Sequence, residues 1–123
     1  MTKKKIRLLI AEDEVIIAQC LTIELELEGY EVCKYVATGE EAVIETAKAK
    51  PDAVLMDINL TGEIDGIEAA KEIIRNNNVP IIFMTGFTES NIFKKAQELN
   101  PVAYLEKPVE VYDITPILEK LFS

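Results

Sequence analysis

The sequence predicts an α/β fold, in which a parallel sheet has helices on both of its faces, and two observations support this. Short apolar runs alternate with longer amphipathic segments from one end of the chain to the other. The short runs are apolar at nearly every position, as expected of parallel strands that are buried on both faces. The length of 123 residues suits one domain built around a single sheet.

The chain begins with an expected strand, a helix and a second strand. Residues 6–11 are apolar apart from Arg7 and end at two carboxylates, which is typical of a buried strand. Residues 14–28 carry apolar side chains at helical spacing, and Gly29 can end this helix as a C-terminal cap. Residues 30–36 form the second expected strand.

The middle of the chain repeats this order. A helix is expected over residues 39–50, and Pro51 ends it because proline cannot continue a helix. Residues 53–56 form the most apolar strand, and Asp57 follows it at once. A loop then leads to a helix over residues 66–76.

The last third of the chain completes the pattern. A fourth strand is expected over residues 80–84, and a fourth helix from Thr88 or Glu89 to about Leu99. A fifth strand over residues 102–105 leads to a helix that closes the chain. Five strands alternating with five helices, without an internal repeat, favour a single α/β domain.

Charge and composition exclude several classes of function. The 22 acidic and 13 basic residues give a net charge of −9, which repels nucleic acid phosphates, so direct nucleic acid binding is not expected. The chain has no histidine, so histidine-based catalysis and histidine metal sites are excluded. Cys20 and Cys33 lack the spacing of a metal site and are expected to be small, buried, unpaired residues.

The sequence also bears on location. No apolar run approaches the roughly 20 residues that a membrane-spanning helix needs. The apolar run over residues 6–11 is too short for a signal peptide. No membrane association is therefore expected, and the cytoplasm is the expected location.

Polar side chains follow four of the five expected strands. Glu12 and Asp13 come after the first strand, Asp57 after the third, Thr85 after the fourth and Lys107 after the fifth. In a parallel α/β sheet, ligands bind outside the carboxyl ends of the strands. These side chains are therefore expected to converge on one edge of the sheet.

Three carboxylates at one edge point to a bound cation. Clustered carboxylates repel one another and raise one another's pKa values unless positive charge is present. Without histidine or paired cysteines, the oxygen ligands favour Mg²⁺ or a similar hard cation. Lys107 is then a counter-charge within reach of an acidic group, and Thr85 can donate a hydrogen bond to an anion held there.

This ordered set resembles the receiver domain of two-component response regulators over the whole chain. The segment Leu55-Met56-Asp57-Ile58-Asn59-Leu60 is similar to the family's phosphorylation loop, and Tyr104-Leu105-Glu106-Lys107-Pro108 to its fifth-strand signature. The resemblance implies a flavodoxin-like, doubly wound sheet in the strand order 2-1-3-4-5. It also implies a stand-alone receiver domain over residues 1–123 with no output domain.

The resemblance further implies roles for the acidic residues. Asp57 would be the phosphoacceptor, attacking a phosphohistidine on a histidine kinase or histidine phosphotransfer protein. Asp13, Asp57 and the backbone carbonyl of Asn59 would hold Mg²⁺, and Glu12 would act through a coordinated water. The chain would then be a signalling domain in a phosphorelay, catalysing only its own phosphoryl transfer and dephosphorylation.

Three more residues have implied roles in binding the phosphoryl group and in switching. Lys107 and the Thr85 hydroxyl would take up phosphoryl oxygens. Thr85 and Tyr104 would be the coupled hydroxyl and aromatic residues that change a protein-binding surface. That surface is formed by the fourth helix, fifth strand and fifth helix, where a homodimer or an unknown downstream protein could bind.

The first helix offers two interpretations. It carries two apolar stripes, although a helix that packs on a sheet needs only one. The second stripe consists of Ile16, Cys20, Ile23 and Leu27. Either both stripes are covered in one wide buried arc, or the second stripe is an exposed patch that docks on a helix of the kinase or phosphotransfer protein.

The sequence also departs from the family pattern. The first acidic residue is Glu12, where aspartate is more usual, and Thr61 stands where many members have proline. The loop from Asp57 to Gly66 is one residue longer than the shortest versions, and its glycines are interpreted as turn and cap residues. Phe87, which is apolar, is expected to slow hydrolysis of the phosphoryl group because it cannot orient a water.

Three other classes of function compete with this interpretation. A haloacid-dehalogenase-like phosphatase needs an Asp-x-Asp pair after its first strand, which this chain lacks. A flavodoxin-like carrier needs a first loop that accepts phosphate, whereas the acidic residues here would repel it. A receiver-like module that binds partners without phosphorylation is the alternative that remains, although such modules usually lack one of the residues present here.

Overall fold

The computed structural model describes residues 4–86 and 89–123. Within these two ranges five strands and five helices alternate, with the bounds β1 Arg7–Ala11, α1 Val15–Leu27, β2 Glu31–Val36, α2 Gly39–Ala49, β3 Ala53–Asp57, α3 Gly66–Asn76, β4 Ile81–Thr85, α4 Ser90–Gln97, β5 Ala103–Glu106 and α5 Val111–Leu121. Every expected element is present, and the bounds differ from those predicted by a few residues at most. The fourth helix begins at Ser90, and the alternative start at Thr88 lies outside the described residues.

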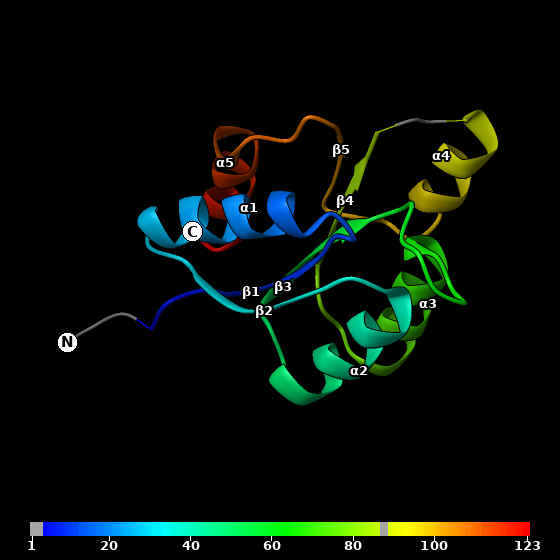
Figure 1. The fold of residues 1–123 in the computed structure, drawn as a ribbon, viewed down its shortest axis with the longest axis horizontal. Helices are drawn as coiled ribbons and strands as arrows, with labels where there is room; N and C mark the ends of the chain where they lie inside the picture. Colours follow the sequence, from blue (N-terminus) through cyan, green and yellow to red (C-terminus); the bar gives the residue numbers. More distant parts are fainter. Residues whose placement is uncertain (1–3, 87–88) are drawn as a thin grey trace.

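The strands form one parallel sheet in the order β2-β1-β3-β4-β5 (Figure 1). This confirms the predicted fold class and strand order. β3 and β4 are buried along their whole length, as the continuous apolar runs predicted. None of the helices in the described ranges is long and apolar enough to cross a membrane.

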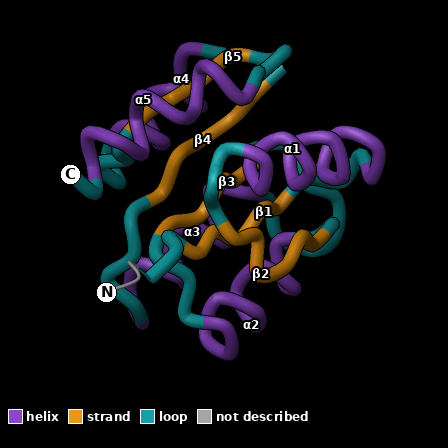
Figure 2. Tube along the Cα trace, turned by 90° about the vertical axis from the view of Figure 1, so that its left-hand side faces the viewer, coloured by secondary structure: helices purple, strands orange, loops and turns teal. Residues whose placement is uncertain are grey.

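The helices cover both faces of the sheet. α1 and α5 pack on one face, where Leu25 and Leu118 belong to one apolar cluster. α2, α3 and α4 pack on the other face, where Ile73 and Ala96 belong to a second cluster. Figure 1 shows α1 and α5 on one side of the strands and α2 and α3 on the other, and Figure 2 shows the same elements turned by 90°. The sheet therefore separates two apolar cores and leaves the carboxyl ends of its strands at one edge.

The edge strand β2 contains an irregularity. Leu8 of β1 lies opposite Val32, but the next residue, Leu9, lies opposite Lys34, so Cys33 is an extra residue in β2. The Cys33 thiol donates a hydrogen bond to the carbonyl oxygen of Leu8 at 3.2 Å. This β-bulge shifts the register of the second half of the strand by one residue.

Candidate functional site

The ends of β1 and β3 bring three acidic side chains together. Ala11 at the end of β1 lies opposite Met56, so the residues after β1 lie beside the end of β3. Carboxylate oxygens of Glu12, Asp13 and Asp57 lie within 4.8 Å of one another. This confirms the acidic cluster that the strand ends predicted.

Asp57 is held on both of its carboxylate oxygens. It is the last residue of β3, and only 1% of its surface is exposed. Its Oδ1 accepts a hydrogen bond from the backbone N–H of Asn59 at 3.0 Å, and its Oδ2 accepts one from Lys107 Nζ at 2.9 Å. A buried carboxylate with two donors has a fixed orientation, which is what a positioned nucleophile requires.

Glu12 and Lys107 form a second ion pair. Lys107 Nζ lies 2.7 Å from Glu12 Oε1, while Glu12 Oε2 accepts a hydrogen bond from the backbone N–H of Glu14 at 3.1 Å. Burial raises the pKa of Glu12 to about 7, although Lys107 and the Glu14 amide act in the opposite direction. Burial also lowers the pKa of Lys107, but Glu12 and Asp57 outweigh it and the net shift is upward. The ammonium group therefore bridges two buried carboxylates.

A cavity of about 280 Å³ opens beside these groups. Its lining consists of Asp13, Glu14, Asp57, Asn59, Gly86 and Lys107. The carboxylate oxygens of Asp13 and Asp57 at the cavity, with Glu12 beside them, fit the all-oxygen ligand set that Mg²⁺ prefers.

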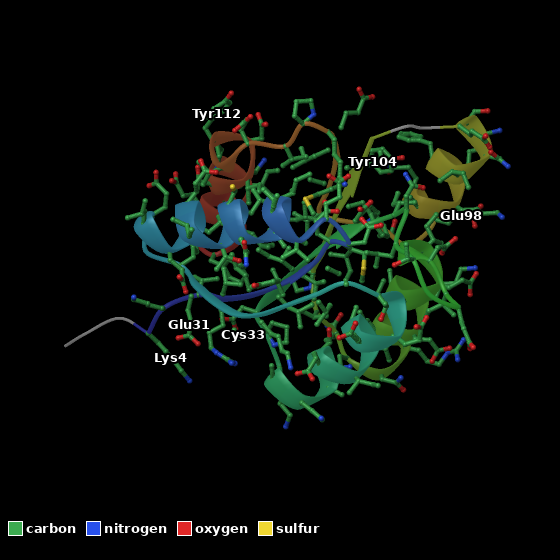
Figure 3. The ribbon with its side chains drawn as sticks, viewed as in Figure 1. Lys4, Glu31, Cys33, Glu98, Tyr104 and Tyr112 are labelled. Carbon is green, nitrogen blue, oxygen red and sulfur yellow. The ribbon has the colours of Figure 1, made fainter. Side chains whose placement is uncertain are left out.

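Thr85 lies at the site, and Tyr104 lies between β5 and α4. Thr85 is fully buried at the end of β4, and Asn59 Nδ2 lies 3.4 Å from its Oγ1. Tyr104 on β5 is half-buried and contacts Phe93 of α4 edge-on, with ring centroids 4.9 Å apart. Figure 3 shows Tyr104 on the side of the sheet that faces α4. Phe87, expected to flank the site, lies outside the described residues.

The second apolar stripe of α1 is exposed. The exposed fractions of Ile16, Ile23 and Leu27 are 75%, 59% and 82%, and Cys20 is also exposed. The buried residues of α1 are Ala18, Leu21 and Leu25. The exposure expected of a docking patch is therefore confirmed, and the interpretation of a wide buried arc is wrong.

One prediction for the cysteines is corrected. Both are free, as expected, but Cys20 is exposed and Cys33 only partly buried. Cys20 is exposed because α1 turns a single stripe toward the sheet and toward α5, and Cys20 lies on the other stripe. The expectation of two buried cysteines was therefore wrong for Cys20.

Two glycines at the site were not recognised as site residues from the sequence. Gly86 lines the cavity. The one feature of the sequence that could have indicated this is that a small residue directly follows the strand end at Thr85. Gly66, interpreted as a turn and cap glycine, starts α3 against the end of β3. A Cβ at Gly66 would overlap the carbonyl oxygen of Asp57 and lie 2.7 Å from Ile58 Cα.

Comparison with characterised proteins gives two informative relatives. The transcriptional regulatory protein PdtaR of Mycobacterium tuberculosis is 39% identical over 117 residues, which are 95% of this chain and 57% of that protein. This chain thus spans little more than half of PdtaR. Sporulation initiation phosphotransferase F of Bacillus subtilis is 30% identical over 115 residues, which are 93% of this chain and 91% of that protein.

A solved structure and a sequence-family match agree with the assignment that these relatives suggest. The signal receiver domain of a modulated diguanylate cyclase from Desulfovibrio desulfuricans G20 superposes with a TM-score of 0.89 at 38% identity, covering 95% of this chain and 93% of that one. The response regulator receiver domain, as a sequence family, matches residues 8–119. The acidic cluster lies at the carboxyl ends of the strands, where the family resemblance implied a phosphorylation site. The chain therefore belongs to the response regulator receiver domain family.

Proposed function

We propose that Asp57 accepts a phosphoryl group from a phosphohistidine of a histidine kinase or histidine phosphotransfer protein, with Mg²⁺ as cofactor. One observation carries this proposal: the buried Asp57 carboxylate, held by Lys107 and by the Asn59 amide, lies beside a cavity that Asp13 also lines. A module that acts without phosphorylation is not favoured, because the phosphoacceptor, the acidic pair and the lysine occur together.

The proposed step is a phosphoryl transfer in line with the departing nitrogen. A carboxylate oxygen of Asp57 bonds to phosphorus as the phosphorus–nitrogen bond of the phosphohistidine breaks. The imidazole nitrogen keeps the electron pair of that bond and takes a proton from solvent. Lys107 Nζ, 2.9 Å from Asp57 Oδ2, is close enough to donate to a phosphoryl oxygen on the acyl phosphate.

The metal ligands in this proposal are oxygen atoms of the chain. Asp13, Asp57 and the backbone carbonyl of Asn59 would hold Mg²⁺, and Glu12 would contribute through a water. When bound, Mg²⁺ would offset carboxylate repulsion and the charge on the transferred oxygens. The partly exposed Asp13 and the exposed Asn59 leave the cavity open to a small phosphodonor.

The direct test is mass spectrometry of the intact protein after incubation with acetyl phosphate and Mg²⁺. One added phosphoryl group, located on the peptide that contains Asp57, is the expected result. Omitting Mg²⁺ should prevent the addition. An unmodified protein under conditions that label another receiver domain would contradict the proposal.

Mg²⁺ should stabilise the folded protein, because the three carboxylates converge only in the folded state. At a hundredfold excess of Mg²⁺ over its Kd, the free energy of unfolding should rise by about 2.7 kcal/mol. Asp13→Asn should remove most of this increase while leaving the fold intact, since Asp13 is only partly buried. Thermal unfolding with and without Mg²⁺ measures both effects, and an equal gain in Asp13→Asn would contradict the ligand assignment.

The switch is proposed to run from Thr85 to Tyr104. When Asp57 carries a phosphoryl group, the Thr85 hydroxyl would move to donate to it, and Tyr104 would turn into the vacated space. Moving a two-state equilibrium from 1:99 to 99:1 takes about 5.5 kcal/mol. One hydrogen bond to a charged group supplies about 1.5–3 kcal/mol, so Lys107 and the metal must contribute as well.

Thr85→Ala should therefore separate phosphorylation from the response. The variant should still accept a phosphoryl group at Asp57, because Thr85 takes no part in the bond that forms. It should lose much of the change in α4 and β5 when beryllofluoride is added as a phosphoryl mimic. Amide exchange over residues 89–99 and 102–107 measures this change, and a full response in Thr85→Ala would contradict the coupled switch.

The partner surfaces follow from the same proposal. The donor would dock on the exposed patch of α1, next to a groove of about 590 Å³ that runs from Ile16 and Cys20 to Pro108. The response would be read by a downstream protein, or by a second copy of the chain, on α4, β5 and α5. The single-domain organisation and the cytoplasmic location stay predictions.

A further inference from the structure

We propose that Glu40 is a positioning residue for the metal site, acting through the loop between β3 and α3. The inference rests on the proposed metal site, because its effect is on the Asn59 carbonyl. Glu40 lies in the first turn of α2 and does not line the cavity beside Asp57. Any influence on that cavity must therefore pass through residues that Glu40 contacts.

The Glu40 carboxylate binds the backbone of the loop directly. Its Oε1 accepts hydrogen bonds from the backbone N–H groups of Glu63 at 2.8 Å and Ile64 at 2.9 Å. Two adjacent N–H groups that point at one anionic oxygen form a backbone nest, and such charge-assisted bonds are stronger than neutral ones. The loop thus closes around a side chain that lies more than twenty residues earlier in the sequence.

The shape of the loop depends on this contact. Gly62 has a φ of +104°, and a Cβ there would come within 2.7 Å of Glu40 Oε2, so a larger residue would push the carboxylate away. A Cβ at Gly39 would come within 2.6 Å of the carbonyl oxygen of Ile64. Both glycines therefore allow the loop and the start of α2 to approach closely.

Two further contacts fix the segment that carries Asn59. Thr61, two residues after Asn59, forms an isolated parallel bridge with Thr38 just before α2. On the other side of the loop, the backbone N–H of Gly66 donates to the carbonyl oxygen of Ile58 at 2.9 Å. The Asn59 carbonyl is thus held from both directions, and the contacts with α2 provide one of the two anchors.

This arrangement gives Glu40 a structural role in the loop. Thr61 restrains the loop backbone less than a proline would, because a proline ring fixes φ. Glu40 supplies the restraint from outside the loop. Without it, the backbone N–H groups of Glu63 and Ile64 lose their contact with α2, and the direction of the Asn59 carbonyl is less firmly fixed for a cation.

The test compares the Mg²⁺ affinity of three variants by calorimetry, at a temperature where each is fully folded. Glu40→Ala should raise the Mg²⁺ dissociation constant about tenfold, as loss of an outer-shell partner does in other metal sites. Glu40→Gln should restore most of the affinity, because its amide oxygen can accept both N–H groups. Glu45→Ala is the matched control: it removes the same charge from the same helix and loses only a contact with Lys34 of β2, so its affinity should equal that of wild type.

A second measurement follows the loop itself without metal. Amide exchange at Glu63 and Ile64 should be faster in Glu40→Ala than in wild type and near normal in Glu40→Gln. Unchanged Mg²⁺ affinity in Glu40→Ala would overturn the inference, as would an equal loss in Glu45→Ala. If wild type and Asp13→Asn bind Mg²⁺ equally, or wild type binds none, the assignment of the metal site is wrong, and the proposed role of Glu40 is wrong as well.

Discussion

Asp57→Asn is expected to reduce labelling by acetyl phosphate to background while the protein stays folded. The amide lacks the anionic oxygen that attacks phosphorus, but it is nearly the same size and can still accept from the Asn59 N–H. Lys107 also keeps Glu12 as a partner at 2.7 Å, so no buried ammonium is left alone. Because one of three crowded carboxylates is removed, the free energy of unfolding should not fall.

Asp52→Asn is the matched control for this experiment. Asp52 precedes β3, at the opposite end of the strand from Asp57, and is exposed. Its labelling should equal that of wild type, measured as the phosphorylated fraction of intact protein by mass spectrometry. Persistent labelling of Asp57→Asn would mean that another residue is the acceptor.

Gly66→Ala is expected to destabilise the protein by about 2–3 kcal/mol, within the range found for overpacked interiors. The added Cβ would meet backbone atoms, the Asp57 carbonyl oxygen and Ile58 Cα, rather than the end of a flexible side chain. The clash can be relieved only by moving the start of α3 or the end of β3. Since the end of β3 carries Asp57, Mg²⁺ affinity should fall in the same variant.

Gly86→Ala provides the contrast, since it makes the same chemical change at the same cavity. Among the residues that the structure describes, a Cβ at Gly86 would meet only Lys107 Cδ at 3.8 Å, an ordinary van der Waals distance. Its stability should stay within about 0.5 kcal/mol of wild type in urea unfolding. If Gly66→Ala is as stable as Gly86→Ala, the close approach of α3 to β3 is not a packing constraint.

The acidic cluster could be predicted because parallel strands end at a common edge. Once the chain was divided into alternating strands and helices, the residues after each strand had to lie near one another, whatever the details of the loops. Glu12, Asp13 and Asp57 follow this rule. Lys107 also follows it and lies 2.9 Å from Asp57, as expected of a counter-charge.

Other features depend on how loops and helices pack, which local patterns do not determine. The spacing of apolar residues in α1 showed two stripes, but only the position of the neighbouring elements decides which stripe is covered. Cys20 was therefore wrongly predicted to be buried. The contact of Glu40 with Ile64 requires the loop after β3 to fold over the start of α2. Nothing in the sequence near either residue signals that contact.

The bulge at Cys33 also affects how copies of the chain meet. A regular edge strand offers a row of unpaired N–H and C=O groups on which a strand from another molecule can be added. The ladder between β1 and β2 is interrupted between Leu8 and Leu9 of β1, and Figure 3 shows Cys33 at the bulge. The charged Glu31 and Lys34 of β2 are exposed. This edge is therefore a poor template for strand addition. We expect association between copies to take place at the opposite side of the sheet, where β5 ends it.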